Sequence, residues 1–249
     1  MEEGGYLGGA LAGIVCFIAG ARLIRLSWRS QTSPELLLGT SFLLWGLAYL
    51  CWQIPVATTN HPLTQPLFFV ARVFSDAAMV VFASFTRITF RPQARWAKIL
   101  VFAIAIGVFT GVTGSIAVGD WEGIQPTDNP WWWVDWVAVF AAMGWVAVEG
   151  LIHYFNARER VRLGLCDPLV CNRYLLWGIT GTVWTVVWGM SAIGYLEFEI
   201  QHFWSSAIDR ATGTLDITGI ALVLLICFPP HFYQRWVRGA APDAEPAEG

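Results

Sequence analysis

Six polar residues lie within two long apolar segments of this sequence and are the first candidates for chemistry. They are Arg72 and Asp76 in one segment and Asp209, Arg210, Thr214 and Asp216 in the other. An ionisable side chain in the hydrocarbon region of a bilayer costs about 2.5–3.5 kcal/mol on insertion scales, so each one there needs a structural or functional reason.

The spacing of these residues predicts two polar helix faces. Arg72 and Asp76 are four residues apart and share a face. Asp209 and Asp216 also share a face, whereas Arg210 points about 100° away from Asp209. One interpretation is an outward-facing polar cavity between the third and seventh helices, where an arginine holds an anionic group and a carboxylate takes a coupling proton. The other is a pair of structural ion pairs, Arg72–Asp216 or Arg210–Asp76, that lock the helices together.

Glu149 and His153 form a second candidate pair, near the opposite end of another apolar segment. A carboxylate one turn from an imidazole is a candidate proton relay, because histidine titrates near neutral pH. The alternative, which we favour, places His153 at the membrane interface and pairs Glu149 with a loop arginine. We expect Asp135, near the outer end of the same segment, to be interfacial.

The composition indicates that membrane-spanning helices position these residues. Apolar residues make up 56% of the 249-residue chain and charged residues 13%, and the mean hydropathy is +0.53. The apolar residues fall into blocks of the length that crosses a bilayer as a helix, about 20 residues each. The blocks lie near 7–27, 35–54, 67–90, 96–118, 131–155, 174–196 and 206–229. The sequence therefore predicts an all-α, polytopic protein with seven transmembrane helices.

The basic residues predict the orientation. Thirteen of the 15 Lys and Arg residues flank one side of the blocks. By the positive-inside rule the N-terminus lies outside and the C-terminus in the cytoplasm. We expect a multi-pass protein of the cell membrane, of the bacterial inner-membrane type. Tryptophans near the block ends are expected to anchor the protein at the two interfaces. They are Trp121, Trp131, Trp132, Trp133, Trp136 and Trp204 outside, and Trp96 and Trp236 inside.

The phrase FLLWGLA at 42–48 returns as YLLWGIT at 174–180. The flanks align in order, with Gly20 on Gly150 and Arg72 on Arg210. We therefore expect one domain over 1–238 with a parallel internal repeat. Repeat 1 covers about 7–92, a linker helix 96–118, and repeat 2 about 131–230. Residues 239–249 are expected to form a disordered acidic tail.

Three strings carry a resemblance: PELLLG at 34–39, FTRITFRP at 85–92 and RLGLCDPLVCNRYLLWG at 162–178. They resemble signatures of an uncharacterised family of bacterial seven-helix membrane proteins, which implies no activity. The 3+1+3 plan is similar in topology to SWEET and PQ-loop proteins, although no Pro-Gln pair stands at the end of the first or the fifth predicted helix. No lysine stands in the last block, which argues against a retinal protein.

These patterns predict a small-solute or proton-coupled transporter with a polar site between the third and seventh helices. The alternative is a membrane sensor or accessory subunit that binds a ligand without transport. Its protein partner would contact the Arg-rich cytoplasmic loops, including a loop expected at 156–173. We expect the lipid bilayer and a small-molecule solute as partners, no nucleic acid, no cofactor, no metal and no enzymatic activity. An oligomer is compatible with the sequence.

Overall fold

The computed structural model is helical throughout the part of the chain that it describes. It describes the backbone of residues 3–57, 64–120, 129–197 and 202–239, and their side chains except those of 3–10, 53–57, 64–65, 191, 194–197, 202–210, 213 and 216. The helices are α1 (Glu3–Ser30), α2 (Ser33–Ala57), α3 (Thr64–Phe90), α4 (Arg95–Ala117), α5 (Pro130–Arg162), α6 (Pro168–Glu197), α7 (His202–Cys227) and α8 (His231–Arg238). The prediction of an all-α protein is confirmed, and each expected apolar block lies on one of the first seven helices.

Several helices meet the length and composition required of a membrane span. Within the described residues these are Leu11–Ser30, Ser33–Trp52, Pro66–Phe90, Arg95–Ala117 and Pro130–Arg162. The end of α7 and the short α8, bent by 80° at Pro229 and Pro230, would together make a sixth. The fold is thus that of a multi-pass membrane protein.

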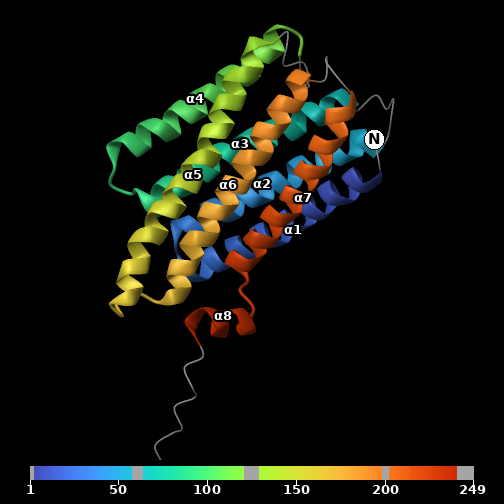
Figure 1. The fold of residues 1–249 in the computed structure, drawn as a ribbon. Helices are drawn as coiled ribbons and strands as arrows, with labels where there is room; N and C mark the ends of the chain where they lie inside the picture. The colour runs from blue at the N-terminus through green and yellow to red at the C-terminus, as the bar shows by residue number, and fades with distance from the viewer. Residues whose placement is uncertain (1–2, 58–63, 121–128, 198–201, 240–249) are drawn as a thin grey trace, which may run out of the picture.

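The helices form a bundle in which neighbours in sequence pack side by side, with α4 at one edge (Figure 1). α1 packs on α2, α2 on α3, α5 on α6 and α6 on α7. Two further contacts, α3 with α5 and α7 with α1, close the six helices into a ring. α4 packs outside this ring against α3 and α5, and its outer face exposes Ile99, Phe102, Ile106 and Phe109. This exposed apolar row is suited to face lipid.

Small residues bring neighbouring helices close together within α1–α3 and within α5–α7. A Cβ on Gly20 of α1 would lie 2.8 Å from the backbone oxygen of Gly39 on α2. A Cβ on Gly150 of α5 would lie 2.5 Å from the backbone nitrogen of Gly178 on α6. Both approaches require glycine, because a side chain would force the backbones apart. Glycine is therefore a packing residue at both positions.

Bulky aromatic rings fill the space between α1–α3 and α5–α7. The Trp45 ring lies 4.8 Å from the Trp184 ring, edge to face, and Phe82 and Phe85 contact Trp177. Trp132 and Trp136 are 4% and 9% exposed and stack on each other at 4.8 Å. The expectation that these two tryptophans anchor the protein at the interface is wrong, because they belong to the interior packing. Trp131, Trp96 and Trp236 are exposed, as interfacial anchors would be, and the side chains of Trp121 and Trp204 lie outside the described residues.

Two boundaries differ from expectation at the arginine-rich end of the bundle. The loop expected at 156–173 is shorter, because α5 continues to Arg162 and α6 begins at Pro168. The side chain of Asp167 accepts a hydrogen bond from the Leu169 amide and so starts α6. The last apolar segment ends at Cys227, and His231 begins the separate helix α8. The expected tail at 239–249 lies outside the described residues except for Gly239.

Candidate functional site

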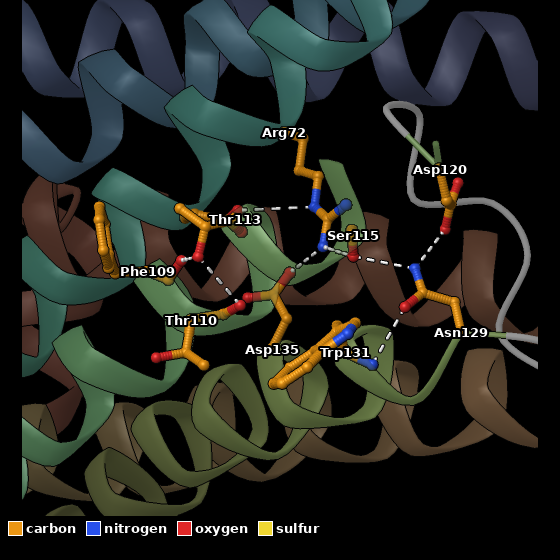
Figure 2. A network of polar contacts seen from close by, with 10 residues as sticks. Arg72, Phe109, Thr110, Thr113, Ser115, Asp120, Asn129, Trp131 and Asp135 are labelled. Atoms are coloured by element: carbon orange, nitrogen blue, oxygen red, sulfur yellow. Dashed lines mark hydrogen bonds and ion pairs between the residues drawn. The ribbon is translucent and has the colours of Figure 1, made fainter. Parts of the chain in front are cut away.

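The polar residues of α3 meet α4 and α5 and form what we call the outer charge cluster. It consists of Arg72 and Asp76 on α3, Asp135 on α5 and Ser115 on α4. Figure 2 shows Arg72 beside Asp135 and Ser115. The Nη2 atom of Arg72 donates hydrogen bonds to Asp135 Oδ2 at 3.0 Å and to Ser115 Oγ at 3.2 Å. Its Nε atom lies 3.9 Å from Asp76 Oδ2, within ion-pair distance. Arg72, Asp76 and Asp135 are 8%, 6% and 7% exposed, so all three charges are buried.

A short chain of hydrogen bonds connects the cluster to the loop after α4. Asn129 Nδ2 donates to Ser115 Oγ at 2.9 Å and to Asp120 Oδ2 at 2.6 Å (Figure 2). Asn129 Oδ1 accepts from the Trp131 amide and caps the start of α5. Two carboxylate oxygens, Asp76 Oδ2 and Asp135 Oδ1, are buried without a hydrogen-bond partner among the described residues. The cluster is thus buried, linked to the outer loop and incompletely satisfied.

The position of Asp135 follows from glycines on α4. A Cβ on Gly111 would lie 2.5 Å from Asp135 Cβ and 2.8 Å from its backbone nitrogen. α4 therefore seats directly on this turn of α5 and covers Asp135 from lipid. Asp135 was expected to be interfacial, and the structure shows its carboxylate buried in the bundle as the direct partner of Arg72.

An aromatic cavity of about 230 Å³ opens on the adjoining face of α3. Its walls are Trp45, Ala48, Tyr49 and Trp52 from α2, Ala71, Ser75 and Met79 from α3, and Trp184 and Trp188 from α6. Ala71, Ser75 and Met79 are four residues apart in turn and share one face of α3. Arg72 and Asp76 each follow one of these residues, and so lie about 100° further around the helix. α3 therefore lines the cavity with one face and carries Arg72 and Asp76 of the charge cluster on the adjoining face.

The second candidate pair, Glu149 and His153, belongs to an inner ion pair. Arg91 Nε, just after α3, donates to both carboxylate oxygens of Glu149, at 2.9 and 3.0 Å. Trp145 Nε1 donates to the same carboxylate at 3.2 Å. The imidazole of His153 packs against the rings of Phe90 and Tyr174, which also contact each other, and its Nδ1 atom lies 2.9 Å from the Glu149 carbonyl oxygen. The interpretation that Glu149 pairs with a loop arginine is confirmed by these contacts.

The predicted residues of α7 are not brought to the outer charge cluster by any described contact. α7 packs on α6 and α1, whereas α3 packs on α2, α4 and α5. The side chains of Asp209, Arg210 and Asp216 lie outside the described residues, and Thr214 is exposed. Of the six residues first singled out, the described contacts join Arg72 and Asp76, and they add Asp135 and Ser115. The signal that could have found Asp135 is its burial cost, since a carboxylate five residues into an apolar helix needs a cation.

Comparison with known proteins adds no relative. No family profile matches the chain. No curated protein and no solved structure matches it either.

Proposed function

We propose that this chain is a seven-span protein of the cell membrane that couples movement of a small solute to movement of a proton. In this proposal the N-terminus is outside, α1–α3 and α5–α7 are the two parallel repeats, and α4 links them. The outer charge cluster takes the proton, and the aromatic cavity takes the solute. The proposed orientation puts both in the outer half of the membrane.

The observation that carries the proposal is an imbalance of buried charge. Among the described residues, two carboxylates, Asp76 and Asp135, share one guanidinium, that of Arg72. If both carboxylates were ionised, the cluster would hold a net negative charge where little water is available to solvate it. Binding one proton removes that charge. Losing the proton is costly while the cluster is shielded from water. The cluster is therefore suited to a transport cycle in which it binds a proton when buried and releases it when water reaches it.

The contacts of Arg72 also narrow the solute class. Its guanidinium is engaged by Asp135, Asp76 and Ser115, and so it is poorly placed to hold an anionic solute. The cavity walls are mainly aromatic, with Ser75 as a hydroxyl at one side. Aromatic faces favour apolar, aromatic and cationic groups. We therefore infer a small aromatic solute, neutral or cationic, in a cavity below the usual volume of drug-sized pockets, about 300–1,000 Å³.

α3 gives the two sites a physical connection. A solute that pushes on Ser75 and Met79 displaces the same helical turns that carry Arg72 and Asp76. Such a displacement changes the separation of Arg72 and Asp135, and with it the free energy of protonating the cluster. Coupling therefore needs only a small rotation of one helix.

The test uses the full-length protein in proteoliposomes loaded with a pH-sensitive dye. Benzylamine, phenol and benzoate are the probes for a cationic, a neutral and an anionic aromatic solute. We expect benzylamine or phenol to drive proton movement, and benzoate not to. Asp76→Asn should abolish proton movement, whereas Trp188→Ala should weaken solute binding. Asp216→Asn tests the carboxylate of α7 that sequence reasoning assigned to the same path.

Glu159→Gln is the matched control, because that carboxylate is exposed on α5 and pairs only with Arg162 among the described residues. Proton movement that persists unchanged in Asp76→Asn would contradict the proposal. Solute binding without any flux in the unmodified protein would favour the alternative of a sensor or accessory subunit.

A further inference from the structure

A basic groove lies between the ends of α1 and α7, far from the aromatic cavity along the bundle. Its volume is about 390 Å³. Its walls are Arg22, Leu23, Arg25, Leu26 and Arg29 from α1, and Cys227 and Phe228 from the end of α7. Three positive charges and four apolar or thiol side chains therefore surround one space. Nothing in the transport proposal uses it.

The three arginines share one face of α1. Arg22 and Arg29 are two turns apart, and Arg25 lies between them on the adjoining row. The guanidinium of Arg22 lies over the Phe228 ring, 4.2 Å from its centre. Within the described part of the chain none of the three pairs with a carboxylate, in contrast to Arg91, Arg162 and Arg238. The groove thus holds uncompensated positive charge, and a cation–π contact fixes one of its donors.

Apolar surface continues from this groove along the lipid-facing side of α1. Leu26 is 47% exposed and Ile18 is 59% exposed. α8 turns away from α7 by 80° (Figure 1). Its Phe232 and Trp236 side chains are exposed. A short helix with exposed rings and with Arg235 and Arg238 in its last turn is typical of a segment lying in the membrane interface. The groove therefore sits where the hydrocarbon region gives way to headgroups.

We propose that the groove binds the phosphate group of an anionic phospholipid from the leaflet at this end of the bundle. Guanidinium groups match the phosphodiester in charge and in hydrogen-bond geometry. An acyl chain continues along Leu26 and Ile18 of α1. A soluble phosphate would meet the charges but would leave this apolar wall uncovered, whereas a phospholipid covers both. Basic pockets between membrane helices are suited to such headgroups.

The experiment compares two triple substitutions in the full-length protein in detergent. R22Q/R25Q/R29Q removes the groove charges. R158Q/R160Q/R162Q is the matched control, because it removes three exposed arginines at the same end of the bundle, on α5. Binding of phosphatidylglycerol and of phosphatidylcholine is measured by native mass spectrometry and by the thermal shift that each lipid produces.

We expect the unmodified protein and the control to prefer phosphatidylglycerol, and the groove variant to bind it about tenfold more weakly or less. An equal loss of phosphatidylglycerol binding in both variants would show that the lipid responds to basic residues in general at this end of the bundle, and would overturn the site. Inorganic phosphate that competes as well as phosphatidylglycerol would assign the groove to a soluble anion instead. A preference that emerges only after removal of residues 240–249 would assign it to that acidic segment. Each of these three results contradicts the lipid site, and none of them depends on transport.

Discussion

Among the residues that the structure describes, carboxylates are buried at two places, and their charges are balanced differently. In the inner ion pair one carboxylate, Glu149, receives two hydrogen bonds from one cation, Arg91, and a third from Trp145. In the outer charge cluster, as far as the described side chains go, one cation faces two carboxylates, and each carboxylate keeps a buried oxygen without a hydrogen bond. The inner carboxylate has a hydrogen-bond donor on each oxygen, and His153 Nδ1 lies 3.5 Å from its Oε2 atom. Among the described residues the outer site holds one more carboxylate than cation.

This difference separates structural charge from candidate functional charge better than burial does. Glu149 is 2% exposed, which is less than Asp76 at 6% or Asp135 at 7%. Burial alone would therefore rank Glu149 first. Counting charges and hydrogen bonds instead ranks Asp76 and Asp135 above Glu149 as functional candidates. The Glu149 carboxylate already has its hydrogen-bond donors and gains little from binding a further ligand.

The largest effect is expected from Arg72→Gln, which leaves two buried carboxylates without their cation. Breaking a buried pair in this way typically costs about 3–5 kcal/mol of stability. The measurement is reversible unfolding in mixed detergent micelles near neutral pH. Adding Asp135→Asn to Arg72→Gln should restore part of the loss. A double variant no more stable than Arg72→Gln would show that the cluster is not one electrostatic unit.

Glu149→Gln should destabilise the protein by about 2–3 kcal/mol, because it removes charge-assisted hydrogen bonds from Arg91. The loss is smaller than for Arg72→Gln, since the Arg91 side chain is 37% exposed and water can solvate it. The same unfolding assay measures it. If Glu149→Gln is as stable as the unmodified protein, the Arg91–Glu149 pair does not stabilise the fold, and the proposed difference between the inner and outer sites is wrong.

Gly111→Ala tests how the outer cluster is positioned. The new Cβ would press on Asp135, and overpacking of this kind costs about 1–3 kcal/mol. Gly144→Ala on α5 is the control, since its Cβ would meet nothing within 4 Å. A buried helix that gains alanine without a clash should be stabilised by about 0.5–1 kcal/mol. Equal stability changes in the two variants would mean that α4 does not hold Asp135 in place.

Asp76→Asn is the most direct test of the difference between the two sites, because it removes one carboxylate at the outer site as Glu149→Gln does at the inner site. Removing the surplus carboxylate should change stability by less than about 1 kcal/mol, or raise it. The same unfolding assay near neutral pH measures the change. Destabilisation as large as that of Glu149→Gln would show that the outer cluster is an ordinary ion pair.

The smallest effect is expected from Asp167→Asn, outside both sites. The pKa of Asp167 is lowered by the hydrogen bond from the Leu169 amide and then by that from Arg238. A carboxyl whose pKa is lower in the folded state stabilises the fold above its unfolded pKa of about 3.9, and that contribution is lost as the pH falls through the folded pKa. The substitution should remove this acid-dependent component, detected as a smaller change in melting temperature between pH 6 and pH 3. An unchanged pH dependence would contradict the assignment.

Hydropathy predicted the helices but not which of them would meet. Residues of an apolar helix can face lipid or protein without a change in amino-acid type, and so the partner of Arg72 could not be chosen from sequence. The repeat drew attention to α7, whereas the described contacts of Arg72 come from α4 and α5. The burial of Trp132 and Trp136 was missed for the same reason, since tryptophan suits both an interface and an interior.

Some of what was missed had a readable signal. The pair Pro229 and Pro230 ends one helix, and the four-residue spacing of Phe232 and Trp236 with Arg235 between them predicts a short amphipathic helix. The arginine partner of Glu149 was predicted correctly in kind, because a buried carboxylate near the basic end has many cations within reach. Its identity as Arg91 required the contact between α3 and α5.

The four-residue spacing of Arg72 and Asp76 also bears on how the chain enters the membrane during synthesis. α3 emerges before α4 and α5, when Asp135 does not yet exist. During that interval Arg72 can be neutralised by Asp76 on its own helix, so that α3 partitions into lipid as a segment without net charge at this turn. When α5 packs on α3, Arg72 forms its 3.0 Å hydrogen bond with Asp135. On this view Asp76 neutralises Arg72 before Asp135 is present.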